Sequence, residues 1–237
     1  MPAVKVNDIN IYYEVYGEGE PIVLIGGLAN DLTDYTRIPI ITTLARKYRV
    51  IVFDNRGVGR SDKPDIPYSI EMMADDTAGL LKKLGIKDTN IVGVSMGGRI
   101  ALDLAIRYPK IVKKLILVST SARIIKSLRR LILFGVLSRI FGFNVFKSEH
   151  PQPRYAFMRQ EKASSSYNCV KRLSEIAAPT IILQGKKDSL VPLKLAEELH
   201  HGITNSKFLL FDGGHAFLFF KPKEFTDAVF DFLKAGK

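Results

Sequence analysis

The sequence has little of several residue types that would assign a chain to a particular compartment. It holds one cysteine, Cys169, so no disulfide can form within the chain, and it has no tryptophan. Its longest apolar run, residues 131–137, is far shorter than the roughly 20 residues that cross a bilayer. The first residues lack the charged and then apolar pattern of a secretory signal. These absences predict a cytoplasmic protein without a transmembrane segment.

Acidic residues are missing between Asp103 and Glu149, an interval that holds ten lysines and arginines. The formal net charge of +11 would suit a nucleic-acid-binding protein. However, the interval carries no nucleic-acid-binding motif with interleaved aromatic residues, so we expect a solvated basic patch and no nucleic-acid partner. Two lesser alternatives stay open for this patch, namely contact with an anionic membrane surface and contact with an acidic carrier protein.

The chain is long enough for one well-buried core, because 46% of its 237 residues are apolar and no long polar linker divides it. We therefore predict a single domain over residues 1–237. β-Prone segments at 3–6 and 10–16 predict an opening hairpin. Short apolar runs, typical of strands buried on both faces, occur at 22–25, 50–53, 91–94, 115–118, 180–183 and 208–211. Segments of helical period alternate with them at 36–47, 70–84, 96–108, 193–201 and 224–233. This alternation predicts an α/β fold with a mostly parallel sheet flanked by helices.

One interval interrupts the alternation, because no buried strand is evident between residues 121 and 176. We interpret residues 121–176 as a small helical cap inserted into the domain. Apolar residues recur there at helical spacing, with arginines between them: Ile124, Ile125, Leu128, Leu131 and Ile132. The pattern fits equally well a helix that lies over a substrate site and a helix that packs on the main core.

The most specific motif is Gly93-Val94-Ser95-Met96-Gly97, which follows a predicted buried strand and precedes a predicted helix. This context matches a nucleophile elbow, in which a tight strand-to-helix turn presents the serine hydroxyl above the sheet. Serine needs a base within hydrogen-bond reach and a carboxylate that orients the base. Ser95 is therefore the predicted nucleophile.

His215 is the predicted base, because it is the one histidine of four that directly follows a predicted strand. For the carboxylate, Asp188 follows the predicted strand at 180–183 and gives the chain order Ser, Asp, His. Asp212 is nearer to His215 in sequence and is the competing candidate. We favour Asp188, because a residue so close to the histidine usually points elsewhere.

An acyl transfer also needs two backbone donors for the oxyanion that forms. The first predicted donor is the N–H of Met96, directly after the nucleophile. The second is assigned to Leu28, in the loop that follows the strand at 22–25, where Gly26 and Gly27 permit a tight turn.

Together these residues resemble the α/β-hydrolase superfamily, and in particular its carboxylesterases, cofactor-free haloperoxidases and enol-lactonases. The stretch from Asp54 to Ser61 is similar to the D-x-R-G-x-G-x-S loop of that family, which the resemblance implies is mainly structural. The chain departs from the family at Gly26-Gly27, where relatives usually carry His-Gly. Because the elbow residue is serine, the resemblance implies acyl transfer, and it argues against dehalogenase and epoxide hydrolase activity.

The resulting hypothesis is hydrolysis of a small-molecule carboxylic ester with a short to medium apolar acyl group, through an acyl-enzyme. Predicted pocket residues are Gly27, Leu128, Leu131, Ile132, Val191 and Phe217. Lactonase or perhydrolase activity, and a ligand-binding protein with little turnover, are the alternatives. No dinucleotide fingerprint or metal-ligand spacing is present in the sequence, so we expect neither a cofactor nor a metal.

Overall fold

The computed structural model describes residues 3–125 and 149–235. Within these ranges eight strands form one sheet in the order β1-β2-β4-β3-β5-β6-β7-β8. The strands are β1 (Ala3–Val6), β2 (Ile9–Tyr16), β3 (Pro21–Ile25), β4 (Arg49–Phe53), β5 (Thr89–Val94), β6 (Val112–Val118), β7 (Thr180–Gly185) and β8 (Ser206–Phe211). Only the pairs β1–β2 and β2–β4 are antiparallel among the described strands. The predicted opening hairpin and the mostly parallel sheet are confirmed.

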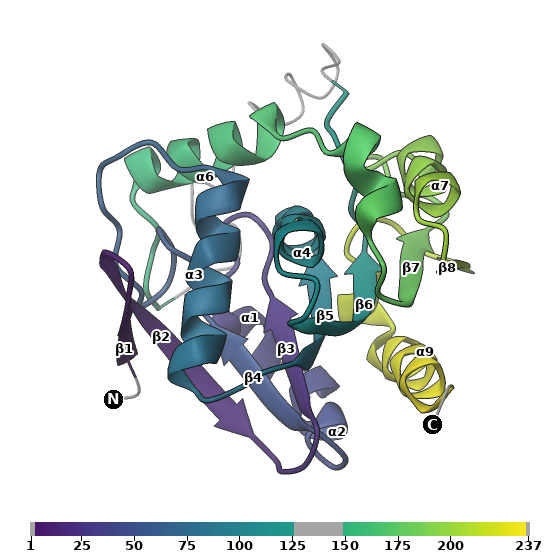
Figure 1. Ribbon diagram of the computed structural model, residues 1–237, viewed down its shortest axis with the longest axis horizontal. Helices are drawn as coiled ribbons and strands as arrows, with labels where there is room; N and C mark the ends of the chain where they lie inside the picture. The colour runs from purple at the N-terminus through teal and green to yellow at the C-terminus, as the bar shows by residue number, and fades with distance from the viewer. Residues whose placement is uncertain (1–2, 126–148, 236–237) are drawn as a thin grey trace.

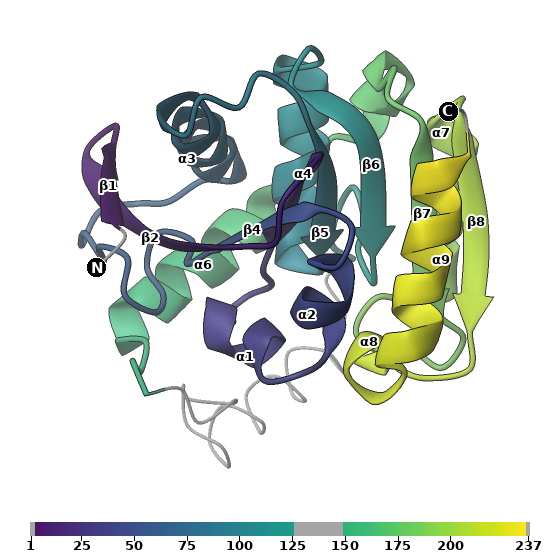
Figure 2. The same cartoon turned by 90° about the horizontal axis from the view of Figure 1, so that it is seen from below.

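Helices cover both faces of the sheet. They are α1 (Leu32–Thr36), α2 (Ile40–Leu44), α3 (Ile70–Lys83), α4 (Met96–Arg107), α6 (Arg154–Ser166), α7 (Leu193–Gly202), α8 (Phe217–Phe220), α9 (Pro222–Lys234) and the 3₁₀ helix η1 (Val170–Glu175). One apolar cluster joins α3, α4 and α7 to one face, and a second joins α2, α8 and α9 to the other (Figures 1 and 2). Each buried strand therefore contributes side chains to both clusters, which explains the continuous apolar runs in the sequence.

The carboxyl ends of the parallel strands meet at one edge of the sheet. Helix α6 lies beyond this edge, where its Gln160 bonds to Ala29 in the loop after β3 and to Arg56 in the loop after β4 (Figure 1). Loops that leave neighbouring parallel strands therefore meet beneath α6, although they are far apart in sequence. This edge is where an open α/β sheet usually binds its ligands.

The helix predicted over residues 36–47 is wrong in its extent, because two short helices replace it. α1 begins at Leu32, after Asp31 accepts a hydrogen bond from the N–H of Thr33 at 2.9 Å. α2 begins only at Ile40, directly after Pro39. Proline has no N–H to donate within a helix, so the two helices do not join.

The prediction for residues 208–211 is wrong in one respect, because that strand is not buried on both faces. β8 is the edge strand of the sheet, and Leu209 and Leu210 are 42% and 38% exposed. An apolar run shows that a segment prefers the strand conformation, but it does not show whether a further strand will pair alongside.

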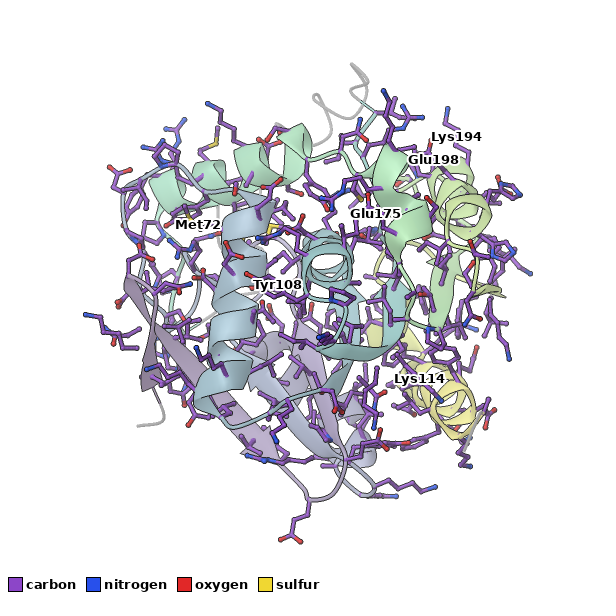
Figure 3. The ribbon with its side chains drawn as sticks, viewed as in Figure 1. Met72, Tyr108, Lys114, Glu175, Lys194 and Glu198 are labelled. Carbon is purple, nitrogen blue, oxygen red and sulfur yellow. The ribbon has the colours of Figure 1, made fainter. Side chains whose placement is uncertain are left out.

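Several basic side chains of the acid-free interval bind partners elsewhere in the chain. The ion pairs are Arg107 with Asp75 and Asp103, Lys113 with Glu20 and Asp88, and Arg123 with Glu198. Lys114 donates to the carbonyls of Phe232, Leu233 and Ala235 at the carboxyl end of α9, where a cation offsets the helix dipole (Figure 3). Much of the positive charge in the described part of this interval is thus used in holding the fold together.

The segment predicted as a cap is described in two parts. Residues 121–125 are joined to the later part by a single β-bridge between Arg123 and Asn168. The later part holds α6 and η1. The helix expected around Leu128, Leu131 and Ile132 lies outside the described residues. None of the helices in the described ranges has the length and apolar content needed to span a membrane.

Candidate active site

Ser95 occupies a strained turn between β5 and α4. Its backbone angles are φ 53° and ψ −113°, a region that residues with a side chain rarely adopt and that is stabilised only by the surrounding structure. The neighbouring glycines are required by space. A Cβ at Gly97 would lie 2.1 Å from the carbonyl oxygen of Ile25, and a Cβ at Gly93 would lie 2.7 Å from that of Gly97. The tight strand-to-helix turn expected from the motif is present.

Three side chains from separate loops form a continuous hydrogen-bonded chain. His215 Nε2 lies 3.0 Å from Ser95 Oγ, and His215 Nδ1 lies 2.8 Å from Asp188 Oδ2. The Asp188 side chain is fully buried, whereas that of His215 is 23% exposed. These hydrogen bonds therefore connect a buried carboxylate to a hydroxyl near the surface, which is the geometry needed to move a proton away from Ser95.

The Asp188 carboxylate is held by donors on both of its oxygens. Oδ1 accepts from the N–H groups of Leu190 and Val191 at 2.9 and 2.8 Å. Oδ2 accepts from Gln184 Nε2 at 3.0 Å in addition to contacting His215. The competing carboxylate of Asp212 is 67% exposed and pairs with Lys187 at 3.3 Å. The structure thus brings Asp188, and not Asp212, to the histidine.

Two residues at the end of β6 hold the main chain on both sides of this contact. Ser119 Oγ donates to the carbonyl of His215 at 2.9 Å, and Thr120 Oγ1 donates to the carbonyl of Ser95 at 2.6 Å. Ser119 itself has a positive φ of 47°. These bonds hold the backbones of Ser95 and His215 to two consecutive residues after β6, so the distance between their side chains is restrained.

The loop that follows β3 lies directly against the serine. A Cβ added to Gly27 would lie 3.4 Å from Ser95 Cβ. The N–H groups of Leu28 and Met96, the two predicted oxyanion donors, donate no hydrogen bond to any residue within 3–125 or 149–235. As far as the described residues go, both N–H groups are available as donors, as an oxyanion site requires.

The predicted pocket residues differ in where they lie. Gly27 is adjacent to Ser95, as described above. Val191 and Phe217 are each only 1% exposed, and Phe217 stacks on Phe211 with 4.5 Å between ring centroids. Both side chains therefore offer almost no surface to a substrate and pack in the interior instead. Leu128, Leu131 and Ile132 lie outside the described residues.

Sequence reasoning missed two buried glutamines that support the site. Gln184 is the only polar residue between Ile181 and Gly185 in β7, and a lone polar side chain in an apolar strand was a usable signal. Gln160, on α6, accepts from the N–H of Ala29 at 3.4 Å and donates to the carbonyl of Arg56 at 2.8 Å. Because both glutamines are fully buried, each bond links the site rigidly to its surroundings.

Two buried carboxyl groups lie beside the loop that contacts Ser95. Burial raises the pKa of Asp34 to about 7, although a hydrogen bond from Asn30 acts in the opposite direction. Burial likewise raises the pKa of Asp54 to about 6, against hydrogen bonds from the N–H groups of Arg60 and Leu32. In the described part of the chain, histidine, cysteine and acidic residues do not gather in any group of three or more that could hold a metal ion.

The fold and the site define an α/β protein in which a serine on a strained strand-to-helix turn contacts a histidine at the carboxyl edge of the sheet. A family model for the alpha/beta hydrolase fold matches residues 20–139. RutD of Azorhizobium caulinodans, whose name assigns it provisionally to carbamate hydrolysis, is 31% identical over 98% of this chain and 98% of its own length. The chain therefore belongs to the alpha/beta hydrolase family.

Solved structures give the same result. The enol-lactonase of Burkholderia xenovorans LB400 has a TM-score of 0.84 and 26% identity, covering 98% of this chain and 99% of that one. A thermophilic esterase from Thermogutta terrifontis also has a TM-score of 0.84 and 26% identity, covering 99% of this chain and 98% of that one. The predicted family and fold are confirmed, including the sheet flanked by helices.

Proposed function

We propose that this protein hydrolyses small-molecule carboxylic esters with short to medium apolar acyl groups. The observation that carries the proposal is the unbroken contact from Asp188 through His215 to the hydroxyl of Ser95. Its similarity to an esterase of known structure supports the substrate class. The chain's one cysteine suits a reducing compartment, so we place the reaction in the cytoplasm.

The reaction proceeds in two acyl-transfer steps. Ser95 Oγ attacks the ester carbonyl carbon while His215 Nε2 takes its proton, and Asp188 stabilises the imidazolium without being protonated. The N–H groups of Leu28 and Met96 bind the oxyanion. The tetrahedral intermediate then breaks its bond to the alcohol, which leaves with the proton from His215. Water, activated by the same histidine, attacks the acyl-enzyme and releases the acid.

Residues 121–176 act in this proposal as a cap on the substrate site. The support is the position of α6 beyond the carboxyl ends of the strands and its contact with Ala29, one residue after the proposed donor Leu28 (Figure 1). A cap in this position would enclose the acyl group and limit its length.

Lactone hydrolysis is the second candidate, because an enol-lactonase is among the similar structures. The two candidates share every chemical step and differ in whether the leaving alcohol stays attached to the acyl group. Carbamates form a third substrate class to include, given the name of RutD.

An activity screen separates these candidates. p-Nitrophenyl acetate, butyrate and octanoate, a γ-lactone and an aryl carbamate are assayed with the wild-type chain and with Ser95→Ala as the blank. We expect the highest kcat/KM on acetate or butyrate, and a loss of at least about 10³-fold in Ser95→Ala. A fluorophosphonate probe should label Ser95 in the wild-type chain alone. Absence of both ester turnover and labelling would overturn the proposal.

A further inference from the structure

The loop that presents Leu28 begins with two glycines, and side chains from elsewhere occupy the space above them. A Cβ at Gly26 would lie 3.2 Å from Cε2 of Tyr35, and a Cβ at Gly27 would lie 2.8 Å from Oδ1 of Asn30. Tyr35 and Asn30 thus fill the positions that side chains at 26 and 27 would take. The support of this loop therefore comes from Tyr35 and Asn30, and not from side chains at positions 26 and 27.

Hydrogen bonds hold both polar groups of Gly27. Its N–H donates to the hydroxyl oxygen of Tyr35 at 3.2 Å, and its carbonyl accepts from the N–H of Asn30 at 3.3 Å. The Tyr35 hydroxyl in turn donates to Oδ1 of Asn30 at 3.5 Å, and Asn30 Nδ2 donates to Asp34 at 2.8 Å. Tyr35 therefore accepts from the loop and donates to the side chain beside it.

These bonds determine where the N–H of Leu28 points. The carbonyl of Gly27 and the N–H of Leu28 belong to one planar peptide group, so restraining the first restrains the second. Glycine on its own would allow this plane to rotate, because it has no Cβ to limit its backbone angles. Two bonds on Gly27 remove that freedom, and both depend on Tyr35 or on its hydrogen-bond partner Asn30.

Tyr35 is well suited to this task. It is 1% exposed, and its ring packs against Phe219 with 5.5 Å between centroids. Burial also raises the pKa of its hydroxyl, which therefore stays protonated and can accept and donate at the same time. Because the Tyr35 hydroxyl is buried and neutral, it carries no negative charge that would compete with the oxyanion for the N–H of Leu28.

We propose that Tyr35 is a positioning residue for acyl transfer at Ser95. Its hydroxyl binds the N–H of Gly27, which holds the Gly26–Gly27 peptide, and also binds Asn30, whose N–H holds the carbonyl of the Gly27–Leu28 peptide. Together these bonds fix the backbone angles of Gly27 and aim the Leu28 N–H at the oxyanion. The proposal rests on the ester hydrolysis proposed above. It identifies a residue that touches neither the substrate nor the three side chains in contact at the site.

The test is Tyr35→Phe, which keeps the buried ring and removes only the hydroxyl. Because a donor that is misaligned still binds part of the developing charge, we expect kcat on p-nitrophenyl acetate to fall about 10-fold, with KM within about twofold. Tyr68→Phe is the matched control. Tyr68 is also buried, and its hydroxyl donates to the carbonyl of Pro64 at 2.8 Å in another loop, so its removal should leave kcat unchanged.

A second measurement separates positioning from a general loss of stability. A trifluoromethyl ketone that adds to Ser95 forms an oxyanion, whereas the matching methyl ketone binds without one. In Tyr35→Phe the inhibition constant of the first should rise by the same factor by which kcat/KM falls, and that of the second should not change. Equal kcat and equal inhibition in Tyr35→Phe and wild type would overturn the inference while leaving ester hydrolysis intact. A wild-type chain that cleaves no ester would overturn both.

Discussion

Two polar clusters are built into this fold, and they differ in whether their hydrogen bonds are complete. At the carboxyl edge of the sheet, Asp188 and His215 lead to the hydroxyl of Ser95. Between β4 and α3, the guanidinium of Arg56 donates to Asp76 and to Asp8, each at 2.8 Å from Nη2. Arg56 is only 1% exposed, although it carries a full charge.

The Arg56 cluster is closed, because Nε, Nη1 and Nη2 each have a carboxylate partner. The side chains of Arg56 and Asp76 are 1% and 3% exposed, so neither can reach a substrate, and only Asp8 of the cluster lies at the surface. The series of hydrogen bonds that ends at Ser95 is open. The serine is partly exposed, and the adjacent N–H groups of Leu28 and Met96 have no partner among the described residues. A buried polar cluster thus stabilises the fold when it is saturated and becomes a candidate for chemistry when one end is left open.

The strongest test of this contrast compares two aspartates near His215. In Asp188→Asn, an amide replaces the carboxylate that orients the imidazole, so the histidine adopts the wrong tautomer and kcat should fall about 10⁴-fold. In Asp212→Asn, only an exposed pair with Lys187 is lost, and kcat should stay within about twofold. Both are measured on p-nitrophenyl esters, with urea unfolding to verify that each variant is folded. Similar losses of kcat in the two variants would contradict the assignment of Asp188 as the carboxylate that orients His215.

The converse test removes the cation of the closed cluster. Arg56→Met leaves Asp76 buried without a positive partner and should lower the free energy of unfolding by about 3 kcal/mol or more. Arg123→Met is the control, because the pair between Arg123 and Glu198 is more exposed and should contribute less than about 1 kcal/mol. Urea unfolding gives both values. If the two arginines proved equally dispensable, Arg56 would not be the structural centre that the contacts indicate.

The residues predicted from the sequence are those whose position along the chain determines their position in the fold. Ser95, His215 and Asp188 each follow a strand of the parallel sheet, and parallel strands end at one edge. A strand pattern alone was therefore enough to bring residues 120 positions apart into contact. The elbow glycines were predictable for the same reason, since their motif encodes a local turn.

The residues that were missed act through packing between distant elements. Gln160 reaches Ala29 across 131 positions, and nothing in the local pattern of α6 indicates which loop lies beneath it. Tyr35 was placed in no element, because its helix is only five residues long and the predicted helix began one residue later, at position 36. Phe217 was assigned to a pocket because it is apolar and near His215, but apolar character does not distinguish a pocket wall from the core against which it packs.

Asp34 is a third kind of buried polar group, neither paired with an opposite charge like Arg56 nor part of an open hydrogen-bonded series like Ser95. Asp34 is buried and bonds to the neutral amide of Asn30, with the charge of Asp31 raising its pKa and that of Arg37 lowering it. Because burial dominates, the pKa of Asp34 is about 7, against the ordinary value of 3.8. Between about pH 4 and pH 7 the folded chain therefore holds a proton that the unfolded chain has released.

The sign of the pH effect follows from this difference in proton binding. Asp34 contributes its full stabilising share below about pH 4, and that share declines as the pH rises through about 7, by at most about 1.4 kcal/mol per pH unit. In Asp34→Asn the side chain does not titrate, and its amide oxygen still accepts a hydrogen bond from Asn30. The variant should therefore gain stability relative to wild type as the pH rises across this range, in urea unfolding measured at matched pH values. If the free energies of unfolding of wild type and variant changed in parallel with pH, Asp34 would already be ionised in the folded protein, as a carboxylate paired with a cation would be.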